Sequence, residues 1–342
     1  MNLLEIIKML SRLPGPPGLQ EQVHRETAEL IKDYVDEVHF DNAGNLIAVR
    51  KSGSALARRL MLYVCTDEPG FIITGVENGF LKFSVRGDTD ERYLPASDVK
   101  ILAADPLFGV ICARAPHTLF LGDADKPLPA DELYIDVGLS QEEAEKRVPL
   151  GTAAVFSAGC EGRDGEKICG KALSCRVGAA VLIKALEYVS GDDLPVDIYA
   201  VFGSREGSGT GGAGPAAFSV EPDYALVIDA THAHLPGASK IPAVRSGKGP
   251  AAATGPCVSR GITDRLTDLA REKKIPFQIE VVPGAGNPTV RAVQTSGAGV
   301  PTVLILLPVR YVNSPAEVAD LKDAEAAVSL IGEFIKDPEE EF

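Results

Sequence analysis

Residues 200–214, AVFGSREGSGTGGAG, join the end of an apolar run to a glycine-rich loop. The apolar run, residues 196–202, is rich in Val, Ile and Tyr, which predicts a buried strand. Glycines at 203, 207, 209, 211, 212 and 214 allow tight turns or a close approach to a ligand, and one acid, Glu206, lies where the strand ends. In an open α/β sheet, sites are built at the carboxyl ends of strands. The stretch therefore predicts either a nucleotide-binding loop or the remnant of a metal-hydrolase loop.

The composition is that of an acidic globular protein. The 342 residues are 45% hydrophobic and 24% charged, with a net charge of −14. That charge disfavours nucleic acid and anionic membranes as partners. No apolar run approaches the roughly 18 residues of a membrane span. Because the N-terminus lacks the features of a secretory signal and the six cysteines form no Cys-x-x-Cys pair, we expect reduced thiols in the cytoplasm.

Strands and helices alternate in both end regions of the chain, which predicts an α/β fold with a mainly parallel sheet. The predicted helices are 3–10, 174–189 and 261–273, and the predicted strands are 45–50, 59–65, 196–202, 224–230, 277–282 and 302–309. The middle instead holds short β-like runs between turns, including 71–76, 81–85, 107–113, 118–121 and 153–158. Such runs are typical of a small β-barrel or sandwich. We therefore expect residues 1–67 and 167–342 to form one α/β domain, with 68–166 as an inserted β domain.

The nucleotide interpretation rests on Gly207, Gly209 and Gly212, which spell G-x-G-x-x-G after a strand, and on Asp229 at the end of the next strand. Its context is poor, because prolines lie close to the loop and Glu206 would place negative charge beside a pyrophosphate. The sequence contains neither a Walker-type loop nor a G-x-S-x-G nucleophile elbow.

Segments along nearly the whole chain match one family in order. They include LPGPPGLQEQV (13–23), VDEVHFDNAGNLIAVRK (35–51), ELYIDVGLSQEEAE (132–145), GKALSCRVGAAVLIKAL (170–186), DYALVIDATHA (223–233) and GVPTVLILLPVRYVNSPAEV (299–318). The chain thereby resembles the glutamyl, or deblocking, aminopeptidases, which are di-metal peptidases that form tetrahedral cages; some relatives carry an endoglucanase label. The resemblance implies a zinc-aminopeptidase-like α/β domain interrupted by a small barrel-like domain. It also implies a homo-oligomer, at least a dimer.

The resemblance implies a metal centre in which four ligand positions have changed. The family holds two metal ions through two His, two acidic residues and one shared carboxylate. The first His corresponds to Cys65, the shared Asp to Ser174, one Glu ligand to Gly207 and the last His to Asn313. Among the ligands, the acid at Asp229 is retained.

The two other catalytic carboxylates of the family are also retained. Glu206 matches the general base, and Asp67 matches the carboxylate that orients a ligand. A catalytic zinc usually needs three protein ligands, and Asp229 with a Cys65 thiolate supplies two. Nearby candidates for a third ligand, for zinc or cobalt, are Cys175, His232 and His234.

We therefore expect an aminopeptidase homologue that has lost its di-metal centre and its catalysis, with no cofactor and with Glu206 and Asp67 vestigial. It would act as a peptide- or partner-binding or assembly protein, with a related active subunit as one candidate partner. A metal-dependent aminopeptidase with a rebuilt single-metal site is the first alternative, and a nucleotide-binding protein is the second. Restoring Glu at Gly207 would be hindered if the backbone there were left-handed.

Overall fold

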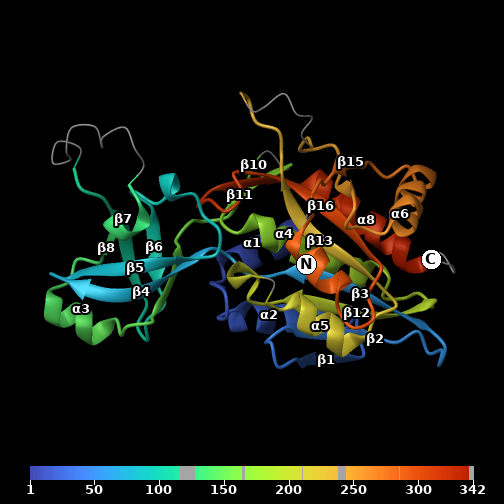
Figure 1. Cartoon of the computed structure of the whole chain (residues 1–342), viewed down its shortest axis with the longest axis horizontal. Coiled ribbons are helices and arrows are strands. Elements are labelled where there is room, and N and C mark those ends of the chain that lie inside the picture. Colours follow the sequence, from blue (N-terminus) through green and yellow to red (C-terminus); the bar gives the residue numbers. More distant parts are fainter. Residues whose placement is uncertain (116–127, 164–165, 210, 238–243, 285, 339–342) are drawn as a thin grey trace.

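The computed structural model describes residues 1–115, 128–163, 166–209, 211–237, 244–284 and 286–338; the predicted run 118–121 lies outside them. The described strands form an eleven-stranded sheet and a closed barrel. The barrel projects from one side of the α/β body, as Figure 1 shows.

The centre of the large sheet consists of four parallel strands that are buried along most of their length. In spatial order they are β12 (Val196–Gly203), β3 (Arg58–Cys65), β13 (Tyr224–His232) and β16 (Thr302–Arg310). Antiparallel strands flank them: β1 (Glu37–Phe40) and β2 (Leu46–Arg50) on one side, and β17 (Glu317–Asp320), β11 (Lys167–Gly170) and β10 (Glu161–Arg163) on the other. β14 (Ala251–Thr254) pairs with β16 and with β15 (Gln278–Val281). The predicted α/β fold is confirmed, and apolar runs with both faces buried explain its parallel centre.

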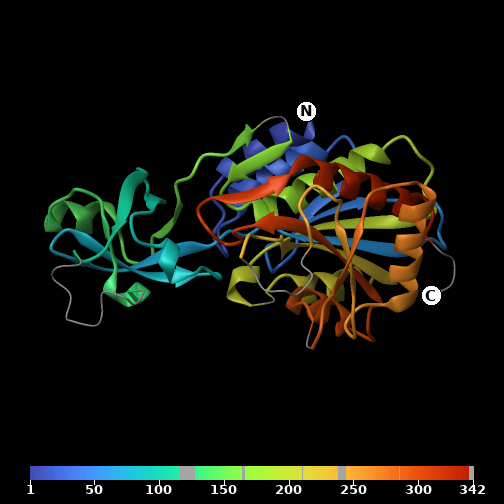
Figure 2. The same ribbon diagram turned by 90° about the horizontal axis from the view of Figure 1, so that it is seen from above.

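Helices cover both faces of this sheet (Figure 2). One face carries α1 (Leu3–Arg12), α2 (Glu21–Ile31), α4 (Leu173–Tyr188), α6 (Arg260–Glu272) and α8 (Leu321–Lys336), and the other carries α5 (Ala213–Val220) and α7 (Pro288–Gln294). α4 is apolar nearly all round because it packs against the sheet on one side and against α1 and α8 on the other. Among the described residues, no helix combines the length and apolar character needed to cross a bilayer.

The barrel closes through six antiparallel strands. In spatial order they are β4 (Gly70–Glu77), β5 (Phe80–Arg86), β8 (Tyr134–Asp136), β7 (Leu107–Cys112), β6 (Asp98–Ile101) and β9 (Ala153–Phe156). Among the described residues of this region, three short helices accompany the strands: η1 (Glu91–Tyr93), η3 (Ala130–Glu132) and α3 (Gln141–Arg147). Alternation along β5 points Leu81 and Phe83 inward. The predicted barrel is confirmed. β10 also falls within 68–166, yet it pairs with β11 in the large sheet.

A buried cluster of charges marks the place where the chain leaves the sheet for the barrel. Glu68 follows β3, is 3% exposed, and accepts a hydrogen bond from the Gly15 backbone N–H at 2.8 Å. Lys171 donates to its other oxygen, and the Arg176 guanidinium lies 3.7 Å away. Burial lowers the pKa of Lys171, although the Glu68 carboxylate opposes that shift. Two buried cations therefore depend on one carboxylate.

We predict that Glu68→Gln lowers the free energy of unfolding by about 3 kcal/mol or more. The substitution removes the counter-charge of both cations, and its amide N–H group would face another donor, either Lys171 or the Gly15 N–H. Urea unfolding followed by circular dichroism measures the change.

Glu161→Gln is the matched control. Glu161 also pairs with two cations, Lys8 at 3.0 Å and Arg12 at 3.2 Å, but its side chain is 66% exposed. We expect a loss below about 1 kcal/mol for this variant. Equal losses of unfolding free energy in Glu68→Gln and Glu161→Gln would show that the burial of Glu68 adds nothing to the stabilising effect of its ion pairs.

Candidate functional site

The carboxyl ends of the central strands bring the predicted site residues to one edge of the sheet. Cys65 is the last residue of β3, Asp229 lies on β13, and Glu206 opens the short helix η4 (Glu206–Ser208) after β12. These strands are parallel neighbours in the order β12, β3, β13, so their ends meet.

Glu206 is held by two hydroxyl groups. The Tyr63 hydroxyl donates to Oε1 at 2.5 Å, and the Thr289 hydroxyl donates to Oε2 at 2.7 Å. Burial raises the pKa of Glu206 to about 7, with smaller contributions from the nearby Asp67 and Asp229 carboxyls. Burial and the Glu206 charge also raise the pKa of Tyr63, which keeps it a donor. Near neutral pH both the protonated and the ionised forms of the Glu206 carboxyl are therefore populated.

Asp67 lies directly beside the glycine-rich loop. Its Oδ1 accepts from the side chain of Gln20 and from the Arg205 backbone N–H at 3.1 Å, and its Oδ2 accepts from the Gly207 N–H at 3.1 Å. Burial raises the pKa of Asp67 to about 6 despite these hydrogen bonds. Asp67 thus fixes the loop that carries Glu206.

Asp229 is bound from the start of α7. The Asn287 amide donates to Asp229 Oδ2 at 2.6 Å, while its own Oδ1 caps the helix by accepting from the Val290 N–H at 3.0 Å. The Ala230 N–H donates to Oδ1 at 2.7 Å. Burial raises the pKa of Asp229. The carboxylate therefore receives hydrogen bonds on both oxygens.

Ser174 and Asn313 meet at a carboxyl group that the sequence did not single out, that of Glu317. Glu317 Oε2 accepts from the Ser174 N–H at 2.5 Å, and Oε1 accepts from the Ser174 hydroxyl at 3.0 Å and the Asn313 N–H at 2.6 Å. Glu317 is fully buried, and burial raises its pKa to about 7. The start of α4, which carries Ser174, and the turn that carries Asn313 are thus connected through Glu317.

The two cysteines at this edge touch each other. The Cys175 thiol, in the first turn of α4, donates to the Cys65 sulfur across 3.5 Å. This hydrogen bond and burial raise the pKa of Cys65 well above its usual range.

Gly207 has no room for a side chain. A Cβ atom there would lie 2.7 Å from Pro17 Cγ and 3.1 Å from Gly87 Cα. The backbone of Gly207 is not left-handed, because its φ lies outside that region, so the hindrance to Glu considered from the sequence does not arise. The obstacle is crowding. The loop glycine Gly212 is crowded as well, since its Cβ would lie 2.1 Å from Asn45 Oδ1. These loop glycines pack against the protein itself.

Left-handed backbone occurs instead at non-glycine residues beside the site. Ala172 (φ 59°) precedes Ser174, Arg205 (φ 63°) precedes Glu206, and Asn313 itself has φ 63°. Such conformations are uncommon for residues with a Cβ and tend to gather at functional sites.

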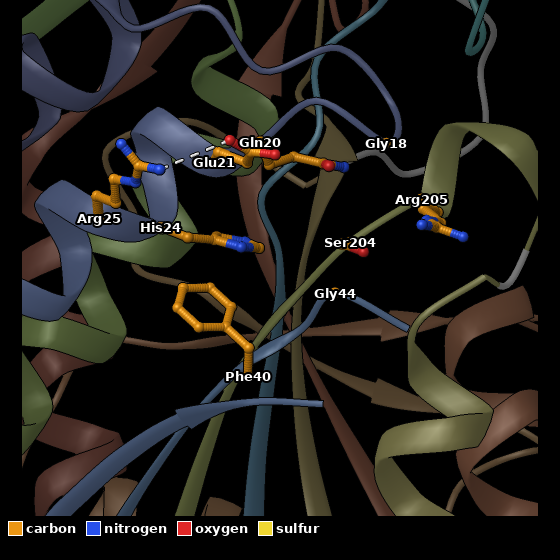
Figure 3. A pocket seen from close by; sticks show the side chains of 9 residues that line it. All are labelled: Gly18, Gln20, Glu21, His24, Arg25, Phe40, Gly44, Ser204 and Arg205. Atoms are coloured by element: carbon orange, nitrogen blue, oxygen red, sulfur yellow. Dashed lines mark ion pairs between the residues drawn. The ribbon is translucent and has the colours of Figure 1, made fainter. Parts of the chain in front are cut away.

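A pocket of about 380 Å³ is lined by residues of α2, of the end of β1 and of the loop after β12 (Figure 3). Gln20 and Arg205, which both donate to Asp67, line it together with His24 and Phe40. Burial lowers the pKa of His24 to about 4, with a further contribution from the Arg176 charge, so the imidazole is neutral. The Asp67 carboxylate is buried and is connected to the pocket only through Gln20 and Arg205.

Comparison with known proteins identifies the family. A family model described as M42 glutamyl aminopeptidase matches residues 44–330. The structure of an aminopeptidase from the archaeon Desulfurococcus kamchatkensis is 34% identical, with a TM-score of 0.92 over 98% of this chain and 94% of that chain. A provisionally named aminopeptidase of Acetivibrio thermocellus is 33% identical over 339 residues, 98% of each chain. The TET1 peptidase of Pyrococcus horikoshii, described as able to assemble into a tetrahedron or a large octahedral shell, is 28% identical, with a TM-score of 0.86 over 98% of this chain and 100% of that chain.

The chain belongs to the M42 glutamyl aminopeptidase family. The donor set at its candidate site does not fit a two-metal centre of the kind that the resemblance implies. Among the described residues, no three His, Cys, Asp or Glu side chains are grouped so that they could hold a metal ion. His232 and His234, two candidates for a third ligand, are both exposed.

Sequence reasoning missed several residues that complete this M42 site. Tyr63, Asn287, Thr289 and Glu317 supply the hydrogen-bond partners of the predicted positions. One signal was present, because Asn287 followed by Pro288 is typical of a helix start after a loop. The partners of Glu206 lie 143 and 83 positions away along the chain, so no local pattern connects them.

We predict that Glu206→Gln makes the stability of the protein less sensitive to pH. The folded pKa is raised to about 7 from 4.5, so this carboxyl stabilises the fold fully below pH 4.5 and loses that contribution as pH rises through 7. Between pH 4.5 and pH 7, the free energy of unfolding of wild type should fall by at most about 3 kcal/mol relative to that of the variant. Gln fits because both partners are hydroxyls, which can rotate to accept as well as donate.

The difference in urea midpoint between wild type and variant, measured from pH 5 to pH 8, gives this effect. Glu325→Gln, at an exposed position on α8, is the control and should show no such trend. A constant difference between wild type and Glu206→Gln across this pH range would contradict the raised pKa.

Proposed function

We propose that this M42 family member has lost peptide hydrolysis and acts by binding peptides or protein partners. The observation that carries the proposal is the replacement of four ligand positions by Cys65, Ser174, Gly207 and Asn313. Ser174 and Asn313 are bonded to Glu317, and Gly207 is packed against Pro17. The groups at these three positions therefore make hydrogen bonds and packing contacts within the protein.

The retained acids support the same proposal. Each oxygen of Asp67, Glu206 and Asp229 already accepts a protein hydrogen bond. Gln20 and Arg205, which hydrogen-bond to the buried Asp67, line the pocket and offer a peptide a polar place to bind. The crowding at Gly212 disfavours the nucleotide alternative, because the side where a Cβ would lie is filled by Asn45 and Ser204.

We propose that the protein is located in the cytoplasm. Its six cysteines are free, and thiols stay reduced in that compartment. Peptides, or a related active subunit, are the proposed partners, and the net charge of −14 disfavours nucleic acid and anionic membranes.

We predict that protein purified without chelator holds well under one equivalent of zinc, cobalt or manganese per chain. It should release no N-terminal residues from unblocked peptides, with or without added zinc or cobalt. Without a dication, a water beside Glu206 keeps a pKa near the bulk value of about 15.7 instead of about 7. The scissile carbonyl also lacks a Lewis acid worth several kcal/mol, and each 1.36 kcal/mol is about tenfold in rate. Elemental analysis and mass spectrometry of a digested peptide library measure both quantities.

Glu206→Ala is the control for activity, and Cys65→Ala is the control for metal. Two tightly held ions per chain would contradict the proposal. One ion that is lost in Cys65→Ala would favour the rebuilt single-metal site. Robust turnover by wild type, abolished by Glu206→Ala, would show that an altered active site is still active. Binding is tested separately by calorimetry with the same peptides, free or acetylated at the N-terminus.

We also propose that the chain forms a homo-oligomer, at least a dimer. Support comes from the Pyrococcus horikoshii relative, because its fold is shared over nearly the whole chain and assembly surfaces do not depend on metal ligands. Light scattering at micromolar concentration should give at least twice the chain mass of 36.1 kDa. A mass equal to that of one chain, unchanged on raising the concentration, would refute this.

A further inference from the structure

We propose that Cys65 and Cys175 form a reversible disulfide when the protein meets a peroxide. The two sulfurs are 3.5 Å apart in the thiol form, and both cysteines are half-buried, so a small oxidant can reach them. An S–S bond of about 2.05 Å requires a further approach of about 1.5 Å, which side-chain rotation can provide. This inference is independent of metal binding and of peptide binding.

The packing of α4 against β3 places the two cysteines together. Gly178, one turn after Cys175, lies so close to the strand that a Cβ atom there would be 2.8 Å from Val64 Cγ2. Val64 immediately precedes Cys65. The close approach of helix and strand at this glycine therefore fixes the separation of the two backbones.

Hydrogen bonds on the neighbouring residues hold the pair in register. The Arg176 guanidinium donates to the Thr66 carbonyl, so the residue after one cysteine is bonded to the residue after the other. The Asp67 N–H donates to the Cys65 sulfur at 3.4 Å. Both segments are anchored before any covalent bond forms, which limits the conformational cost of closing it.

The chemistry balances with a peroxide as the oxidant. One thiolate attacks the O–O bond and becomes a sulfenic acid, releasing water once the leaving oxygen is protonated. The second sulfur attacks the sulfenic sulfur, the S–O bond breaks, and a second water leaves. Two thiols thus lose two electrons and two protons, and one peroxide is reduced to two waters. A dithiol reductant reverses the reaction through thiol–disulfide exchange.

The location of the bond gives it a consequence for the fold. The 110 positions that separate the cysteines include every strand of the barrel, from Gly70 to Phe156. A disulfide would therefore close a loop that contains the whole barrel together with β10 and β11. In the chain-entropy model, closing a loop of this length stabilises the folded state strongly.

The experiment uses the full chain, reduced, desalted and treated with a small molar excess of hydrogen peroxide. We expect titratable thiols in denaturant to fall from six to four and the intact mass to fall by about 2 Da. A non-reducing tryptic map should join the peptide of residues 60–82 to ALSCR, residues 172–176. The melting temperature should rise by about 5 °C. Dithiothreitol should return the thiol count, the mass and the melting temperature to those of the reduced protein.

Cys175→Ser and Cys169→Ser form a matched pair of variants, since both cysteines are half-buried. After peroxide treatment, Cys175→Ser should keep all of its remaining thiols, whereas Cys169→Ser should still lose two thiols. If a variant does not fold, the peptide map of wild type decides. Six thiols after peroxide, a bond from either cysteine to a different partner, or oxygen added at Cys65 without the cross-link would each overturn the proposal.

Discussion

The position of the whole site depends on one buried guanidinium, that of Arg176. It is fully buried at the start of α4 and donates to the carbonyl oxygens of Leu10, at 3.1 Å, and Thr66. Glu68 lies 3.7 Å away and supplies the nearest carboxylate. The loop after α1 fits only because Gly15 has no side chain, since a Cβ would lie 2.6 Å from Nη2. A planar group with five donors can bind several carbonyls at once, which a lysine cannot do.

This arrangement explains how protein contacts hold the geometry of the candidate site. Arg176 and Glu68 organise the end of β3 and the start of α4 through protein contacts alone, so replacement of ligands leaves that geometry intact. Glu317 in the same way links the start of α4 at Ser174 to the turn that contains Asn313. The fold and the family are therefore shown, while loss of catalysis rests on the chemistry of the replaced side chains.

The sequence predicted the fold well because its strands are long apolar runs. Residues 302–309 were predicted as a strand and form β16 to within one residue. The site was predicted in part: strand order brings Cys65, Glu206 and Asp229 to one edge, which follows from parallel pairing. The hydrogen-bond partners could not be predicted, because contacts such as Tyr63 with Glu206 join positions 143 residues apart. Crowding was equally hidden at Gly207, where the contacts come from other loops.

The barrel packs directly against the candidate site. The segment after β5 places Gly87 against Gly207, whose Cβ would lie 3.1 Å from the Gly87 Cα. Two residues later, the Thr89 hydroxyl donates to the Asn313 carbonyl at 2.7 Å. One segment of the insert thus covers two of the four changed ligand positions. A longer side chain at 207 would force this segment or Pro17 to move, so the glycine at 207 and the position of the barrel segment depend on each other. A Glu side chain at position 207 would therefore have to open this contact before it could reach a metal ion.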